Sequence, residues 1–168
     1  MMRETDLQKR NNVNFIYLDT TMKAFFNDLF QYNRLRNKEM IDLCVGNTPQ
    51  VSENTVDLFS HNLNAHHLWN HRITGTEPRY GVWDLHLMNS WDSIDRQNYE
   101  HSLEIIESGR LEENFRFTDS KGHQHENVVH DIHFHIVNHT TYHRAQIVQS
   151  LKATGLKPGR TDFIYYKR

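Results

Sequence analysis

Apolar residues recur at helical spacing along most of the chain, and the few glycines and prolines mark where helical segments end. From about residue 17 to 44 the apolar positions return every three or four residues until GNTPQ interrupts them: Phe25, Leu29, Tyr32, Met40 and Leu43. We predict a first helix over this range.

Two further helices follow the same logic. Ser52 offers a hydroxyl that can cap a second helix, which is expected to run to about Ile73 and to stop before Gly75. After the linker GTEPRYGVWD, a third helix is predicted from about Asn89 to Ser108.

The last third of the chain contains the weakest and the strongest of these patterns. FRFTDSKGHQHEN has a short alternating stretch and a DSKG turn, which indicate a small hairpin or an irregular loop. A fourth helix should run from about Val128 to Thr154 and end at Gly155, and the apolar tail DFIYYKR should pack back on the body. We therefore predict an all-α four-helix bundle with a short hairpin or irregular loop before the last helix, as a single domain over residues 1–168.

Composition restricts the class of protein further. The net charge is -2, from 19 basic and 21 acidic residues without a run of like charge, so neither nucleic acid nor an anionic membrane is expected as a partner. Cys44 is the only cysteine, which excludes an intrachain disulfide and a cysteine zinc site. No apolar signal region or membrane-spanning stretch is visible, so we expect a cytoplasmic protein.

One stretch of the last predicted helix carries four histidines, HFHIVNHTTYHRAQI. Because each helical residue advances by about 100°, its apolar positions define the direction of the core. With Ile132 set to zero, Ile136 lies at about 40° and Ile147 at about 60°. We therefore place the buried face at a small positive angle.

Two of the four histidines fall inside this predicted face. His139 lies at about -20° and His143 at about 20°, whereas His135, at about -60°, and His133, at about 100°, lie at the edges. Two imidazoles one turn apart can bind one ion. The alternative is a pair of core histidines that hydrogen-bond each other or buried polar groups.

A metal would need a further ligand from a facing helix, and HNLNAHHLWNHR supplies several candidates. His61 lies on one apolar face of this helix, and His66 and His67 lie on another, so periodicity does not choose between them. A helix with two apolar faces is buried on both or presents one to a partner chain. Val137 and Val148, opposite the apolar stripe of the last helix, indicate the same, and we predict a homodimer.

The chain resembles the DinB (damage-inducible)/YfiT-like family of metal-dependent proteins. The resemblance rests on HIVNHTTYHRAQIVQSL with the following DFIYYKR, on SHNLNAHHLWNHRITG, and more loosely on LFQYNRLRNKEMIDLC, and covers most of the chain after about residue 20. It implies a four-helix bundle that holds a divalent ion, often zinc or nickel, with three histidine ligands. Carried onto this chain, these are His61, His139 and His143. One departure is Ala145, where the family frequently has glycine.

A site of three histidines permits chemistry at the metal. Three neutral ligands leave at least one position open, and the ion can lower the pKa of bound water to about 7 or deprotonate a thiol. The resemblance implies that a low-molecular-weight thiol is activated for transfer to an electrophilic small-molecule substrate. Gln146 is a candidate hydrogen-bond partner of a ligand, and Arg144 is expected to form a salt bridge on the outer side.

Three alternative functions differ in how well the sequence supports them. HENVVH lacks the second histidine of a metalloprotease motif, because Val129 occupies that position. His130 and Asp131 suggest an HD-type phosphohydrolase, which would need a further distant His and Asp. A non-catalytic metal-binding or dimerisation module is also compatible with the sequence.

The remaining histidines are interpreted as surface or loop residues by default. His125 and His130 are additionally candidates for the mouth of the pocket, because loops often carry function. The default group is His66, His67, His71, His86, His101, His123 and His125.

Overall fold

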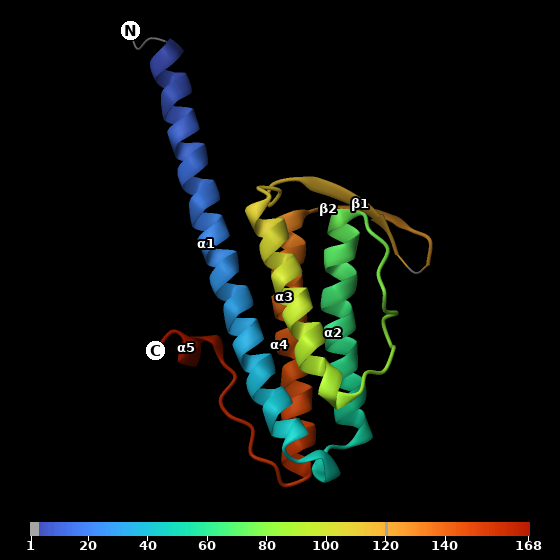
Figure 1. Cartoon of the computed structure of the whole chain (residues 1–168). Coiled ribbons are helices and arrows are strands. Elements are labelled where there is room, and N and C mark those ends of the chain that lie inside the picture. Colours follow the sequence, from blue (N-terminus) through green and yellow to red (C-terminus); the bar gives the residue numbers. More distant parts are fainter. Residues whose placement is uncertain (1–3, 120) are drawn as a thin grey trace.

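Four long helices lie side by side in the computed structural model of this protein (Figure 1). The structure describes the backbone of residues 4–119 and 121–168, and the side chains from residue 20 onward within those ranges. The long helices are α1 (Glu4–Val45), α2 (Glu53–Thr74), α3 (Trp91–Glu107) and α4 (Val129–Ala153). The antiparallel strands β1 (Asn114–Thr118) and β2 (Gln124–Val128) precede α4, the short helix α5 (Phe163–Tyr166) follows it, and 3-10 turns span Thr48–Gln50 and Met88–Ser90. The protein is thus mostly helical with one small sheet, and the predicted hairpin is confirmed.

The helix ends follow the local signals in the sequence. Ser52 caps α2, since its Oγ accepts a hydrogen bond from the Thr55 N–H at 3.3 Å. Gly75 ends the same helix with a φ of 69°, a left-handed conformation that glycine adopts without a steric penalty. The start of α1 at Glu4 differs from the predicted start at about residue 17. The prediction followed the apolar repeat, whereas this polar segment has no glycine or proline to stop a helix.

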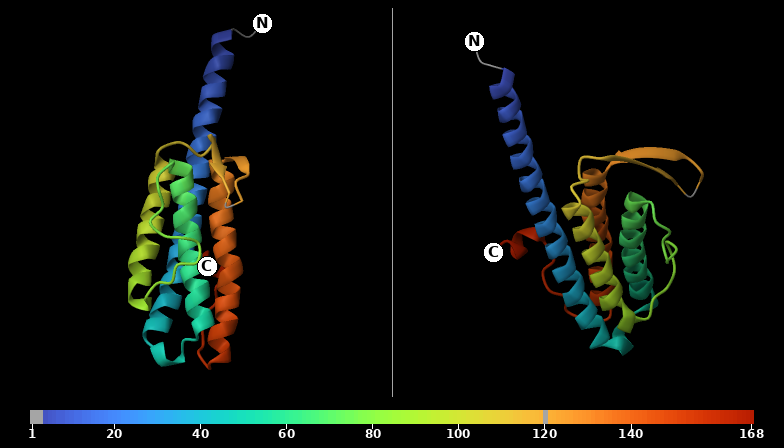
Figure 2. Two further views of the ribbon diagram at one scale, coloured as in Figure 1. Left: turned by 90° about the vertical axis from the view of Figure 1, so that its right-hand side faces the viewer. Right: turned by 45° about the horizontal axis from the view of Figure 1, so that its top comes forward.

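The path of the chain brings the linker after α2 over that helix. In Figure 1, α2 and α3 run in the same direction, and α1 and α4 run in the opposite one. The linker of residues 75–87 therefore returns along the length of α2 before α3 begins, and the left view of Figure 2 shows it crossing the outer face of α2. This crossing puts linker residues beside side chains in the middle of α2.

The interior consists of two apolar clusters with polar residues between them. One cluster includes Phe30, Ile106 and Ile136, and the other includes Phe59, Trp91 and Leu151. On every long helix, buried polar residues lie between the members of the two clusters: Asn33, Asn37, His66, Asn70, Asp95, Asn98, Ser102, Thr140 and Arg144. We call these residues the polar layer.

Arg144 lies inside this layer, so the predicted salt bridge on the outer side is wrong. The side chain is 1% exposed. Its Nη1 donates to Tyr32 Oη at 3.1 Å, and its Nη2 donates to Asn37 Oδ1 at 3.1 Å and to Asn33 Oδ1. Arg144 therefore links α4 to α1 through neutral acceptors.

The buried face of α4 is also rotated from the predicted one. It extends from Ile132 at zero to Val137 at about 140°, because the polar layer occupies its middle. His139 and His143 consequently lie at the rim of the core instead of within it. Val137 is buried inside the chain, which removes one of the two observations that suggested a partner subunit.

Two further histidines depart from their predicted surroundings. His133, placed at the edge of the face, is fully buried, and His66, interpreted as a surface residue, is 4% exposed. His66 Nε2 hydrogen-bonds Ser102 Oγ at 2.8 Å, whereas neither ring nitrogen of His133 has a hydrogen-bond partner among the described residues. The core therefore contains two imidazoles that the sequence pattern did not assign to it.

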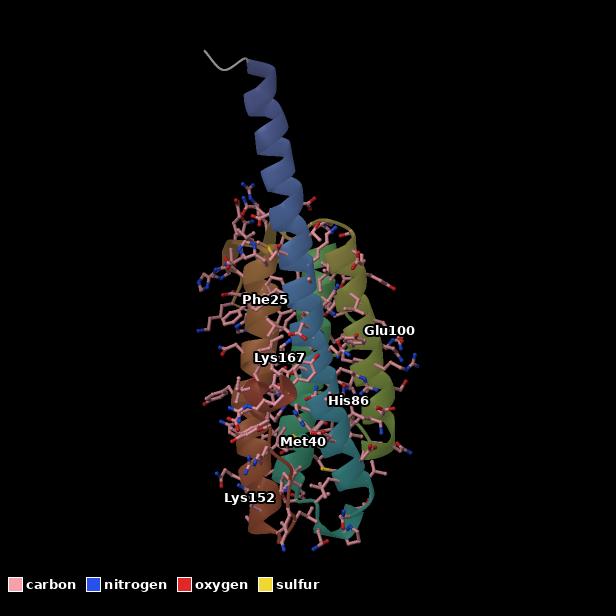
Figure 3. The ribbon with its side chains drawn as sticks, turned by 90° about the vertical axis from the view of Figure 1, so that its left-hand side faces the viewer. Phe25, Met40, His86, Glu100, Lys152 and Lys167 are labelled. Atoms are coloured by element: carbon pink, nitrogen blue, oxygen red, sulfur yellow. The ribbon has the colours of Figure 1, made fainter. Side chains whose placement is uncertain are left out.

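The C-terminal tail packs on α1, as predicted. The ring of Phe163 meets Tyr32 edge-on at 5.1 Å, and Lys167, labelled in Figure 3, donates from Nζ to Asp28 Oδ2 at 2.8 Å.

Within the described part of the chain, no helix combines the length and the hydrophobicity that a membrane crossing requires.

Candidate metal site

Three histidines converge between α2 and α4. His61 is buried on α2, and His139 and His143 are half-buried one turn apart on α4. The Nε2 atoms of His61 and His139 are 3.2 Å apart, and one ring nitrogen from each of the three residues lies within 4.8 Å of the others. The structure thus brings together the three residues that the family resemblance implied.

The separation of these nitrogens suits a shared ion. Two nitrogens bound to a tetrahedral zinc at about 2.0–2.1 Å are roughly 3.3 Å apart. The observed 3.2 Å between the two Nε2 atoms is close to that value. Two lone pairs repel at this distance unless a proton or a cation lies between them, so the donor set fits a divalent metal.

Hydrogen bonds on the far side of two rings turn Nε2 toward the centre of the group. His61 Nδ1 donates to the carbonyl oxygen of Val82 at 3.3 Å, and His143 Nδ1 donates to Gln146 Oε1 at 2.8 Å. Since both oxygens are acceptors only, these bonds keep the proton on Nδ1 and leave Nε2 of each ring with its lone pair. The hydrogen bond predicted for Gln146 is present.

Burial favours the neutral form of His61 and His139. It lowers the pKa of His139 to about 4, with further lowering from the neighbouring His143 and His61, and it also lowers the pKa of His61. The rings of His61 and His139 are therefore uncharged at neutral pH. Each has one nitrogen with a free lone pair that can coordinate a metal without first losing a proton. No carboxylate belongs to this group among the described residues, so an ion would keep its full charge.

Aromatic side chains form the rim of the group. The indole of Trp83, in the linker, stacks on His61 at 4.1 Å with an interplanar angle of 16°, and it is 67% exposed. Tyr142 is exposed beside His143 at 5.0 Å between ring centroids. Neither residue was predicted from the sequence, although VW inside a linker rich in glycine and charge was a visible signal.

The alternative third ligands make other contacts. His66 faces Ser102 in the core, and His67 Nε2 accepts a hydrogen bond from the Arg79 N–H at 2.9 Å. His67 lines a separate cavity of about 230 Å³ together with His71, Tyr80 and His101. None of the three converging histidines lines this cavity. Of the three candidates on α2, His61 is the one that lies beside His139 and His143.

The candidates for the pocket mouth also lie elsewhere. His125 is on the hairpin beside Asp119, and His130 Nδ1 donates to the carbonyl oxygen of Leu111 at 3.0 Å. His130 Nε2 lies 3.4 Å from Asp131 Oδ1, but neither residue belongs to a group of three or more described residues that could share an ion. The HD-type reading therefore has no cluster to support it.

The single cysteine does not take part in this site. Cys44 is fully buried in the apolar cluster around Trp91, and burial raises the pKa of its thiol to about 11. A thiolate is the nucleophilic form, so Cys44 is unreactive at neutral pH. Any thiol used at the site must come from another molecule.

Replacing Gln146 with alanine is expected to weaken metal binding by about 10–100-fold, because His143 then loses the acceptor that orients its ring. Competition with a chromogenic chelator would measure the affinity. The matched control is Gln149→Ala, which changes an exposed glutamine of the same helix and should leave the affinity unchanged. Equal affinities in the two variants would contradict this role of Gln146.

Comparison with known proteins identifies one family. The model described as the DinB family matches residues 47–168, most of the chain, and this range contains all three converging histidines. No curated protein and no solved structure matches the chain.

Proposed function

Because the chain belongs to the DinB family, we propose that His61, His139 and His143 hold a divalent metal ion, zinc or nickel. The observation that carries this proposal is the convergence of three imidazoles, two of them with Nε2 atoms 3.2 Å apart. We also propose that the four long helices form a DinB-type four-helix bundle that is a single domain.

The activity that we propose is the transfer of a low-molecular-weight thiol, or of water, to an electrophilic substrate. When bound, the ion would supply Lewis-acid chemistry that lowers the pKa of the nucleophile. Val82 and Gln146 hold two of the ligand rings, and the exposed Trp83 and Tyr142 offer apolar surface to a substrate. Because Cys44 is buried, the thiol is a separate small molecule.

Metal analysis tests the site. Purified without a metal-binding tag and passed over a desalting column, the wild type should retain about one ion per chain, and His139→Ala and His143→Ala should lose it because each removes a ligand. The control His101→Ala removes a histidine outside the group and should retain the ion. Retention by the first two variants, or a wild type without metal, would reject the site.

The reaction is tested separately. The metal-loaded chain is incubated with a panel of small thiols and a chlorodinitrobenzene electrophile, and thioether formation is measured for the wild type and His139→Ala. Turnover that the variant lacks supports the enzyme. A tightly held ion without turnover of any pair would favour the second candidate, a non-catalytic metal-binding module.

We retain the homodimer as a proposal. Its support is the exposed apolar surface of the linker, where Trp83, Leu85 and Leu87 are between 66% and 77% exposed. Sedimentation velocity would show a monomer if this surface serves only substrate.

A further inference from the structure

A second group of potential ligands lies on the hairpin. Asp119 directly follows β1, His123 directly precedes β2, and His125 is the second residue of β2. Asp119 Oδ2 lies 3.2 Å from His123 Nδ1 and 3.0 Å from His125 Nε2. These separations match the 3.2 Å between the Nε2 atoms of His61 and His139.

The turn fixes the carboxylate before any ion binds. Asp119 Oδ1 accepts hydrogen bonds from the backbone N–H groups of Lys121 at 2.8 Å and of His123 at 2.9 Å. The Asp119 N–H donates to the His123 carbonyl at 2.9 Å and closes the hairpin. One carboxylate oxygen is thereby held by the backbone, and the other faces both imidazoles.

One of the imidazoles is held as well. Phe117 and His125 are partners in the strand register, and their rings stack at 5.3 Å with an interplanar angle of 25°. Phe117 in turn meets Trp69 of α2 edge-on at 5.1 Å, which ties this part of the hairpin to the helices. The ligand set therefore combines a fixed carboxylate with a ring seated on the body of the protein.

We propose that Asp119, His123 and His125 form a second site for a borderline divalent cation such as zinc. Two imidazoles and one carboxylate are a ligand set that first-row divalent metals accept, and the single negative charge attracts the cation. All three side chains reach solvent, so water completes the coordination. The ion is exchangeable, in contrast to the one proposed between α2 and α4, and its binding clamps the two strands at the turn.

Without an ion, the same three residues form a hydrogen-bonded pair of histidines around a carboxylate. Both imidazoles then donate to Asp119 Oδ2, which needs a proton on His123 Nδ1 and on His125 Nε2. A divalent cation would take the place of these two protons. The ion and the two hydrogen bonds therefore cannot be present at the same time. Direct measurement of bound metal separates the two states.

Equilibrium dialysis of the full chain against buffered free zinc measures this site. The wild type is expected to bind two ions, one that survives desalting and one that does not. Asp119→Asn keeps an oxygen for the turn but removes the charge, and His125→Ala removes a ligand, so both should lose the exchangeable ion only. The matched controls Asp57→Asn, at an exposed position of α2, and His101→Ala should bind as the wild type does.

The outcome is independent of the site between α2 and α4. In His139→Ala the exchangeable ion should remain while the tight ion is lost, and a wild type with only an exchangeable ion would reject the first site and not the second. An exchangeable ion that is absent from the wild type, or that persists in both Asp119→Asn and His125→Ala, would overturn the proposal.

Discussion

Replacing Arg144 with alanine is expected to lower the free energy of unfolding by about 3–5 kcal/mol. The guanidinium is buried and donates to Tyr32, Asn33 and Asn37, which all lie on α1. Its removal leaves their oxygens without this donor in the interior, and each unsatisfied buried group costs about 1–3 kcal/mol. A cavity at the centre of the polar layer adds to the loss. Urea-induced unfolding, followed by far-UV circular dichroism, measures the change.

Two variants give this measurement its controls. Arg96→Ala removes an arginine whose partner Glu100 is exposed on the same helix, and should change stability by less than about 0.5 kcal/mol. Arg144→Lys keeps the charge but loses the planar fork of donors, so its stability should lie between those of the wild type and Arg144→Ala. A loss below about 1 kcal/mol in Arg144→Ala would show that the layer does not depend on this residue.

Acidification from pH 7 to pH 5 is expected to destabilise the protein by at least about 4 kcal/mol, the part that His66 and His133 contribute together. Burial lowers the pKa of both residues to about 3 in the folded protein, compared with about 6.5 in the unfolded chain. Between these values the unfolded chain binds more protons, so the free energy of unfolding falls as the pH falls from 6.5 toward 3. Each residue contributes about 2 kcal/mol of the loss at pH 5. Denaturant unfolding at both pH values, with a chelator present throughout, measures the loss.

His133→Leu isolates one half of this effect. The two ring nitrogens of His133 have no partner among the described residues, and a leucine of similar volume forfeits no hydrogen bond that the structure shows. The variant should be at least as stable as the wild type at pH 7, and should lose about 2 kcal/mol less on acidification. An unchanged pH dependence would contradict this, because it would mean that His133 has the same pKa in the folded protein as in the unfolded chain.

The parts of this protein that local signals determine were predictable from the sequence. Ser52 and Gly75 mark the ends of α2 because capping involves only neighbouring residues, and the DSKG turn marked the hairpin for the same reason. The pair His139 and His143 was visible because one helical turn separates them, whatever the rest of the fold.

Features that depend on several helices at once were not predictable in this way. The polar layer hides the true buried face of α4, because Thr140 and Arg144 do not register as core positions in an apolar pattern. The hydrogen bonds that accompany their burial come from other helices: the Thr140 carbonyl accepts from Asn62 Nδ2, and Arg144 donates to Tyr32, which is over a hundred residues away along the chain. The choice of His61 over His66 likewise required the family resemblance or the coordinates, since both lie on apolar faces of α2.

The linker that returns along α2 carries the residues of the site that can change, and the helices carry those that cannot. The three histidines are on helices whose positions are fixed by the core, whereas Val82 and Trp83 come from a segment without regular structure. Insertions and substitutions in such segments are tolerated far better than in helices. On the proposed function, descendants of this protein could therefore acquire different substrates by altering residues 75–87 while the three histidines stay in place, so that selection for a new substrate need not act against folding.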